Sequence, residues 1–306
     1  MRINKSVFLS KIFNLNLPFF IYRKLRSSND KSNISSRIIK IAIVSVFLGV
    51  FVSLSAISIG RGLQSSIKEK LYSLSPDITI STYENNSRGI ASEKINNFHV
   101  VDSEIKTAFP DFKFENIIEK PTLISKNNSF ETVIFRGVND GYSFENFNKF
   151  ILGSNTLNNL TSKEIIISKS LSDKLGITVG QNLTLYFKID NNQRIPNLRS
   201  YTVTHIFNTD FPDFDNNYVI GNLQTLQNVF KWNNNEYASI EISINEKLKI
   251  SSIVQSISSL KSLEKNNLSI KSINSKYDNI FNWISIFDFN IILITSLMIL
   301  VAIISV

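Results

Sequence analysis

The residues that could do chemistry are few in this chain and lie far apart. The two histidines, His99 and His205, lack the spacing of metal ligands, and the chain has no cysteine. His205 alternates with Val203 and Phe207 in a predicted strand, which is typical of a structural residue. We therefore expect neither a metal site nor a histidine-based active site.

An acidic cluster is the next candidate. Asp210, Asp213 and Asp215, followed by Asn216 and Asn217, offer the oxygen ligands that calcium prefers. The cluster lacks the glycine and the distal glutamate of a twelve-residue calcium loop. We therefore expect a solvated loop here.

Motifs for nucleotides and for activated nucleophiles are absent from the sequence. It contains no G-x-x-x-x-G-K-[ST] loop, no G-x-G-x-x-G and no G-x-S-x-G turn, and no paired carboxylates stand out. The sequence therefore predicts no catalytic residue, no cofactor and no nucleotide bound by the chain itself.

Two apolar runs are long enough to cross a bilayer, which takes about 20 helical residues. The first, Ile41–Gly60, has twenty residues without a charge, and the second, Phe289–Val306, has eighteen and reaches the end of the sequence. We expect two transmembrane helices, at 41–60 and from 288 to 306, with the second one cut short. A cleaved signal peptide is the alternative for the first run, but its apolar region is usually about 7–15 residues after a short basic segment.

The charge excess is confined to the N-terminal tail. Residues 1–40 hold nine Lys and Arg against Asp30 alone, a net charge of +8, whereas residues 41–306 hold 24 basic and 24 acidic residues. Because short cytoplasmic segments retain Lys and Arg, residues 1–40 are expected inside the cell. The basic isoelectric point thus reflects membrane topology, and nucleic acid is not an expected partner. Within this tail, Pro18 and FFIYRKLR predict an interfacial helix, with a disordered tail as the alternative.

Amphipathic helices are predicted to continue both spans as stalks. Leu63, Ile67, Leu71 and Leu74 recur at helical spacing after the first span, until Pro76. A matching face precedes the second span and includes Ile280 and Ile284. We expect Ile67, Leu71, Ile280 and Ile284 to couple motion of the membrane helices to the domain between them.

The region between the spans, 61–287, is predicted to be a mixed α/β domain held by its own core. Runs rich in β-branched and aromatic residues predict strands at Asp77–Thr82, Phe130–Val138, Glu164–Ser168, Leu183–Ile189, Tyr201–Asn208 and Ala238–Ile244. Helical spacing predicts helices at Lys169–Leu175, closed by Gly176, at Leu223–Val229 and at Leu248–Leu263. The fold class is thus an α+β membrane protein with a mixed α/β extracytoplasmic domain.

Six segments occur along the chain in an order that can be compared with known protein families. These are FFIYRKLRSS, the span ending SIGRGLQSSIKEKL, PDITIS, KEIIISKSLSDKLGITVGQNLTLYF, RSYTVTHIFNTDFPDFDNNYVIGNLQTLQNVF and SKYDNIFNWISIFDFNIILITSLMILVAIISV. Their order resembles the FtsX/MacB-type permeases, which have a MacB-like periplasmic core domain. Within that family it resembles in particular the lipoprotein-releasing LolC/LolE branch, with Asp215 at the position of the family's usual Asp.

The resemblance implies a non-catalytic permease subunit of an ABC transporter in the bacterial inner membrane. It implies a separate ATPase subunit, a second permease in a homo- or heterodimer, lipoprotein cargo and a soluble lipoprotein carrier. In the LolC/LolE branch a loop captures the carrier, and the corresponding residues here are Lys188–Arg199. Arg194, Pro196 and Arg199 are the candidate contacts, and a plain hairpin connection is the alternative.

Two other functions stay open at this point. A MacB-like efflux permease would pump periplasmic substrates outward instead of extracting anchored lipoproteins. A two-span sensor would bind a ligand with its outer domain and signal inward.

The predicted topology can be tested with single cysteines, because the chain has none of its own. In cells with a permeabilised outer membrane, we expect Ser162→Cys to react with a membrane-impermeant thiol reagent and Ser32→Cys to be protected. Labelling of Ser32→Cys without Ser162→Cys would refute the orientation.

Overall fold

The computed structural model of the 306-residue chain describes residues 34–83, 93–126, 129–188, 196–244 and 249–304. The chain divides into two compact units. One holds the described parts of Met1–Ser65 and Asn282–Val306, and the other is Ser66–Phe281. The second unit lies inside the predicted domain 61–287, and its limits fall within helices that run through both units.

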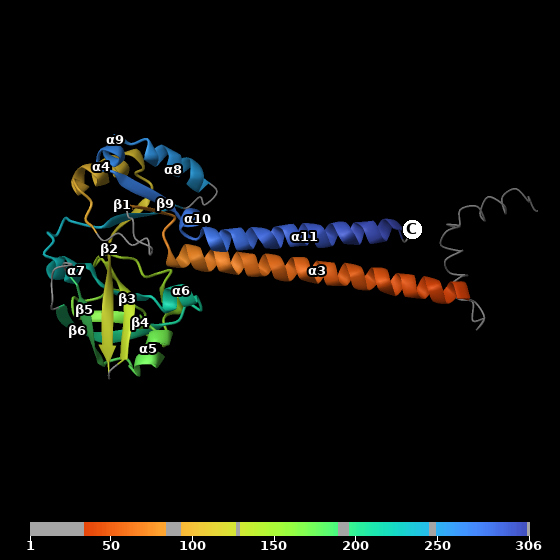
Figure 1. The fold of residues 1–306 in the computed structure, drawn as a ribbon, viewed down its shortest axis with the longest axis horizontal. Helices are drawn as coiled ribbons and strands as arrows, with labels where there is room; N and C mark the ends of the chain where they lie inside the picture. The colour runs from red at the N-terminus through yellow and green to blue at the C-terminus, as the bar shows by residue number, and fades with distance from the viewer. Residues whose placement is uncertain (1–33, 84–92, 127–128, 189–195, 245–248, 305–306) are drawn as a thin grey trace, which may run out of the picture. The chain divides into compact units, whose positions relative to one another are not determined.

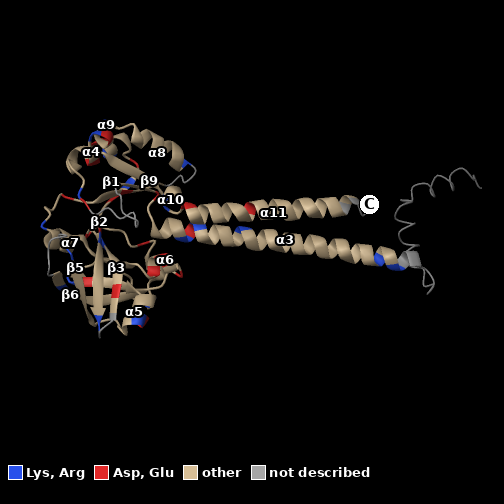
Figure 2. Cartoon of the chain, viewed as in Figure 1, with Lys and Arg blue, Asp and Glu red and all other residues tan. Residues whose placement is uncertain are grey.

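The first unit consists of two long helices. Helix α3, Ile34–Leu74, and helix α11, Asp278–Ile304, each contain a stretch long and apolar enough to cross a membrane. Figure 2 shows long stretches of both helices that are almost free of charged residues. An added Cβ at Gly60 would lie 3.2 Å from Ile291 Cδ1, so the two helices approach closely there.

The second unit contains a nine-stranded mixed sheet that divides into two lobes (Figure 1). We call the first the helix-capped lobe. It comprises the antiparallel strands β1, Ile78–Thr82, β8, Ser239–Ser243, and β9, Leu268–Ser272, with the first part of β2, Lys113–Lys126. Its apolar face is covered by α4, Phe98–Ala108, α8, Ile250–Ser258, and α9, Lys261–Lys265.

The second lobe is a barrel, which we call the barrel lobe. The rest of β2 pairs with β3, Ser129–Val138, and with β5, Asn182–Phe187, and so closes a ring of six strands. The other three members are β4, Glu164–Ser168, β6, Asn197–Phe207, and β7, Tyr218–Asn222. The pairs β3–β7 and β4–β6 are parallel and the others antiparallel, which confirms the predicted mixed sheet.

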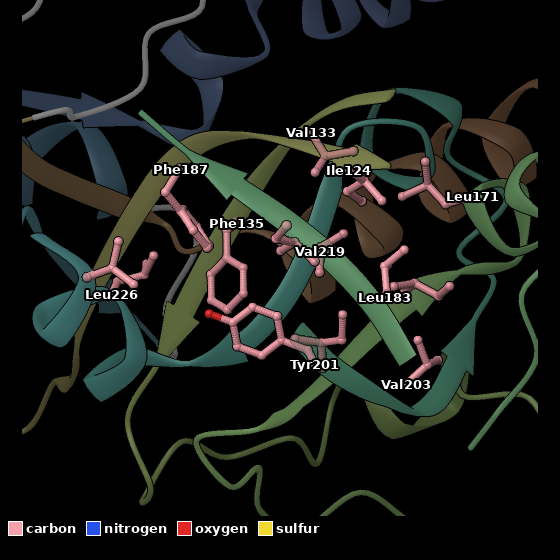
Figure 3. Packing of buried hydrophobic residues seen from close by; sticks show 14 of the residues in the cluster. Ile124, Val133, Phe135, Leu171, Leu183, Phe187, Tyr201, Val203, Val219 and Leu226 are labelled. Atoms are coloured by element: carbon pink, nitrogen blue, oxygen red, sulfur yellow. The ribbon is translucent and has the colours of Figure 1, made fainter. Parts of the chain in front are cut away.

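The interior of the barrel is apolar and aromatic (Figure 3). The Phe135 ring lies 5.8 Å from the Phe187 ring and 5.7 Å from the Tyr201 ring. Helices α5, Lys169–Leu175, and α7, Leu223–Phe230, add Leu171 and Leu226 to this core. A second cluster, the outer cluster, lies on the outside of the barrel. It includes Ile117, Phe144, Phe147, Phe150, Leu157, Leu160, Ile166, Phe207, Phe214 and Ile220, with the 3₁₀ helix Asn148–Phe150.

Local sequence explains several element boundaries. The Ser168 hydroxyl accepts a hydrogen bond from the amide of Leu171 at the start of α5, and Gly176 ends the helix at a φ of 60°. The apolar run of β4 is buried on both faces, since Ile165 and Ile167 face the barrel core and Ile166 faces the outer cluster. These boundaries match the sequence prediction.

Other elements differ from the prediction. Strands β2, β7 and β9 and helix α4 were not predicted, and the predicted helix Leu248–Leu263 is divided into α8 and α9. Strand β5 ends at Phe187, before Ile189, and β6 begins at Asn197, before Tyr201. The remaining short helices are α6, Pro212–Asp215, and α10, Ile273–Lys276.

Proline explains why β2 is hard to find in the sequence. Pro121 lies in the middle of the strand, opposite Ile134 of β3. The Ile134 amide donates to Asn217 on its other side, so no ladder hydrogen bond is needed from Pro121 toward β3. On its other edge, β2 pairs with β8 up to Ile117 and with β5 from Leu123. Pro121, which has no backbone N–H, lies between these two ladders, so neither one loses a hydrogen bond.

A bulge interrupts the alternation that was predicted around His205. The ladder between β4 and β6 shifts between Ile165 and Ile166, so Val203 and His205 do not continue one alternation. Val203 faces the barrel core and Phe207 faces the outer cluster. His205 is only partly buried, and its Nδ1 atom has no hydrogen-bond partner among the described residues.

Close packing around Gly221 yields a stability prediction. A Cβ at Gly221 would lie 2.3 Å from Phe135 Cζ, whereas a Cβ at Gly141 would meet nothing within 4 Å. We expect Gly221→Ala to lower the free energy of unfolding by about 1–3 kcal/mol, the usual cost of overpacking a core. Chemical denaturation would measure this, with Gly141→Ala as the matched control. Phe135→Leu should restore part of the loss in Gly221→Ala, and equal stabilities of the two alanine variants would contradict the packing.

Candidate functional site: the base of the stalk

The candidate site is the end of α3 and the start of α11 within Ser66–Phe281, which we call the stalk base. Leu71 is 1% exposed and belongs to the core of the helix-capped lobe, and Ile67 and Ile280 pack against the same core. The structure thus brings three of the four predicted coupling residues to one cluster. Ile284 is also buried, at 2% exposed, and lies in the helical unit.

The last turn of α3 is shared by two cores. Leu71 packs in the helix-capped lobe, and Leu74, three residues on, packs in the outer cluster of the barrel lobe. Residues three apart lie on neighbouring positions of one helical face. A displacement of this turn therefore acts on both lobes at once.

Polar contacts hold the stalk base on several sides. The Ser75 and Tyr277 hydroxyls lie 2.7 Å apart and join the end of α3 to the segment before α11. Lys149 Nζ donates to Ser73 Oγ at 2.8 Å, and Lys70 Nζ lies 3.5 Å from Asp210 Oδ2. The Lys70–Asp210 pair is largely exposed and adds little to stability, but it shows that the loop before α6 lies beside the helix.

Asp77 anchors the chain directly after the stalk. It is buried, and its Oδ2 atom accepts a hydrogen bond of 2.7 Å from the amide of Ile244. Its backbone carbonyl accepts from the amide of Ile273 at the start of α10. One residue thus ties together the segments that follow α3, follow β8 and precede α11.

The two long helices are also joined by a polar contact in their own unit. Gln64 Nε2 donates to the backbone carbonyl of Ile284 at 3.3 Å and to Asp288 Oδ1 at 3.0 Å. Gln64 is buried, so this amide is a specific contact in an otherwise apolar helix pair.

A buried ion network joins the two lobes beside the stalk base. Arg136 of β3 donates through Nη1 to Glu119 Oε1 at 2.6 Å and to Glu241 Oε1 at 2.8 Å, and through Nη2 to Glu241 Oε2. Glu241 lies on β8 in the helix-capped lobe, and Arg136 lies on the barrel. Since removal of one partner would leave a buried charge, the network favours one fixed arrangement of the lobes.

Beside the network, two glutamates lie opposite each other in the ladder between β2 and β8. Glu115 of β2 lies directly opposite Glu241 of β8 in the ladder, an arrangement that is destabilising by itself. Burial raises the pKa of the Glu115 carboxyl above its ordinary value, and Glu241 acts in the same direction. Lys113, whose Nζ lies 3.5 Å from Glu115 Oε1, opposes this shift.

The remaining predicted site residues lie elsewhere. Arg194 is outside the described residues, Pro196 is partly buried, and Arg199 is exposed on β6, paired with Leu185, rather than in a loop. The structure therefore does not bring Arg194, Pro196 and Arg199 together as a described surface.

The acidic cluster is only in part the solvated loop that was predicted, since Asp210 and Asp213 are exposed and Asp215 is not. Asp215 is buried, and its carboxylate accepts hydrogen bonds from the Thr209 hydroxyl at 2.7 Å and from the Thr209 amide at 3.2 Å. Asp213 and Asp210 do not join it, and no group of three His, Cys, Asp or Glu residues within the described ranges could hold a metal ion. His99 is exposed on α4.

Sequence reasoning missed Arg136, Glu119 and Glu241. A lone arginine inside the apolar run TVIFRGV was a signal of a buried charge that needs a partner. The identity of that partner had no signal, because Glu241 lies 105 residues further along the chain.

One family model matches the chain, and solved structures of low sequence identity resemble it. The family model of the MacB-like periplasmic core domain matches residues 41–260. The periplasmic region of MacB from Actinobacillus actinomycetemcomitans is 15% identical, with a TM-score of 0.41 over 67% of this chain and 92% of that one. The extracellular domain of the noncanonic ABC-type transporter YknZ from Gram-positive bacteria is 13% identical, with a TM-score of 0.42 over 64% and 98%. No curated protein matches the chain.

The ion network yields a second stability prediction. Arg136→Met should lower the free energy of unfolding by about 3–5 kcal/mol, because Glu119 and Glu241 would remain buried without their cation. Lys169→Met is the control. It removes an exposed pair with Asp173 and should cost no more than about 0.5 kcal/mol. Adding Glu119→Gln and Glu241→Gln to Arg136→Met should recover stability, and an Arg136→Met protein as stable as Lys169→Met would refute the network.

Proposed function

Because the chain belongs to the family of the MacB-like periplasmic core domain, we propose that it is a non-catalytic permease subunit of an ABC transporter. The family match over residues 41–260, more than half of the 306-residue chain, is the observation that carries this proposal. A separate ATPase subunit supplies the energy, in keeping with the lack of a phosphate-binding loop in this sequence. A second permease subunit completes the transporter.

The proposed topology places the apolar stretches of α3 and α11 in the bacterial inner membrane. Residues 1–40 then lie in the cytoplasm, and the domain Ser66–Phe281 lies in the periplasm. Support comes from the length and apolar character of both helices and from the +8 charge of residues 1–40.

The proposed mechanism is mechanical. ATP binding and hydrolysis move the membrane helices, and α3 and α11 transmit the movement into the domain. The sharing of Leu71 and Leu74 between two cores supports this, since a rigid helix end cannot shift without repacking both lobes. The Arg136 network then sets how far one lobe follows the other.

The proposed cargo is a lipoprotein released from the inner membrane to a soluble carrier. Its support is the resemblance of the ordered segments to the LolC/LolE branch, and Arg194, Pro196 and Arg199 are the proposed carrier contacts. Efflux of periplasmic substrates is the alternative. Palmitate-labelled lipoprotein shed from spheroplasts on addition of a carrier would support release, and unchanged shedding with increased drug sensitivity of the deletion strain would support efflux.

A two-span sensor is the alternative from a different class. Purification of the full-length protein from membranes distinguishes the classes, since a permease co-purifies with an ABC ATPase and a sensor with a kinase or another signalling protein. Absence of an ATPase from the purified complex would refute the permease proposal.

The coupling role of the stalks predicts the effect of a buried charge. Ile284→Asp places a carboxylate where the side chain is 2% exposed, at a cost of several kcal/mol, about tenfold that of an exposed substitution. Ser285→Asp, at the exposed neighbouring position, is the matched control. In the assembled transporter we expect Ile284→Asp to lose transport with the ATPase still bound and Ser285→Asp to keep it. Normal transport by Ile284→Asp would show that this helix face carries no coupling.

A further inference from the structure

A cavity of about 310 Å³ lies beside the stalk base, within Ser66–Phe281. Its lining comes from β3 and the start of β7 in the barrel lobe, from the α6 region, and from the end of α10 with Tyr277 after it. A volume of this size suits a small organic molecule. Neither the transport proposal nor the family match assigns a ligand to it.

Four aromatic residues, two from each of two ring pairs, line the cavity. The Phe214 and Tyr218 rings stack with their centroids 4.7 Å apart, and the Phe211 and Tyr277 rings meet edge to face at 6.1 Å. The rings offer apolar surface to the body of an aromatic or aliphatic ligand.

Lys276 gives the cavity a cationic end. Its side chain is exposed to solvent, and within the part of the chain that the structure describes it makes no ion pair or hydrogen bond. Its ammonium lies 5.7 Å from the centroid of the Tyr277 ring. Glu119 and Glu241, the acids of the ion network, already accept hydrogen bonds from Arg136.

The charge states of the polar groups suit an anion. Burial raises the pKa of the Tyr218 hydroxyl, and Glu119 adds to the rise. At neutral pH the cavity therefore offers an ammonium and a neutral hydroxyl, both of which can donate hydrogen bonds.

The frame of the cavity is held by contacts outside it. Asp215 and Thr209 fix the turn that carries Phe211 and Phe214, and the Ser75 hydroxyl holds the Tyr277 hydroxyl at 2.7 Å. Asp213 on the same lining is an acid that does not pair with Lys276 and would repel an anion placed beside it. A preformed frame loses little entropy when a ligand binds.

We propose that this cavity binds a small amphipathic anion, with its carboxylate or similar group on Lys276 and Tyr218 and its apolar body between the two aromatic pairs. The ligand would contact Tyr277, which also bonds to the end of α3 through Ser75. The proposal does not depend on the transport role, because binding can be measured without an ATPase.

The test compares two probes of the same shape, 1-naphthaleneacetate and its neutral amide, 1-naphthaleneacetamide. Titration calorimetry on the purified full chain should show saturable one-site binding of the acetate, and binding of the amide at least about tenfold weaker. Lys276→Met should bind the acetate as weakly as the amide, whereas Lys276→Arg should retain the preference.

Lys163→Met, at an exposed lysine outside the cavity, is the control and should behave like the unmodified protein. Thermal unfolding of each variant checks that the fold is intact, and the Lys276→Arg protein serves as a second folded reference. Equal binding of the two probes by the unmodified protein, loss of preference in Lys163→Met, or no saturable binding at millimolar probe would overturn the proposal.

Discussion

The structure of the domain depends on the continuity of one strand. Strand β2 gives its first residues, 113–117, to the ladder with β8 and its later residues, 118–126, to the ladder with β3. Both lobes thus share a backbone that is stiff because its hydrogen bonds are satisfied on successive partners. At the point of transfer the strand has only β3 as a neighbour, and Pro121 lies there. The Arg136 network joins the lobes at this part of β2, since it contacts Glu119 of β2 and Glu241 of β8. It therefore restrains rotation of one lobe relative to the other where β2 is paired on one edge only.

At the stalk base, neighbouring side chains of one helix end pack in the cores of both lobes. Leu71 and Leu74 belong to different cores, and Asp77 bonds to segments that lie far apart in the chain. Such an arrangement has few intermediate positions, because close-packed side chains shift between discrete arrangements rather than deforming smoothly. A helix that ends in this way can pass on a displacement over its length, whereas a helix joined by a loose linker would absorb it.

Local pattern explains which parts of this fold could be predicted. The two apolar helices, the continuation of α3 beyond Gly60, and β4, β5 and α5 follow from periodicity and capping residues that the segments carry themselves. Strand β2 could not be found because its burial comes from partners on both lobes and because Pro121 is tolerated only by its place between them. At the site, helical spacing identified Ile67, Leu71 and Ile280, but Arg136 and Glu241 meet only after the sheet has formed. The cavity residues are likewise assembled from three separate segments.

The closed barrel has a consequence for its hairpin between β5 and β6. Phe187 pairs with Asn197, so the register of the two strands is set at the mouth of the connection. The length of the connection can then change at little cost, since doubling a flexible loop adds only about 0.6 kcal/mol of closure entropy. The ladder between β5 and β6 would stay unchanged if residues 188–196 were lengthened, shortened or exchanged. Insertion at this junction would therefore leave the barrel and the stalk base as they are.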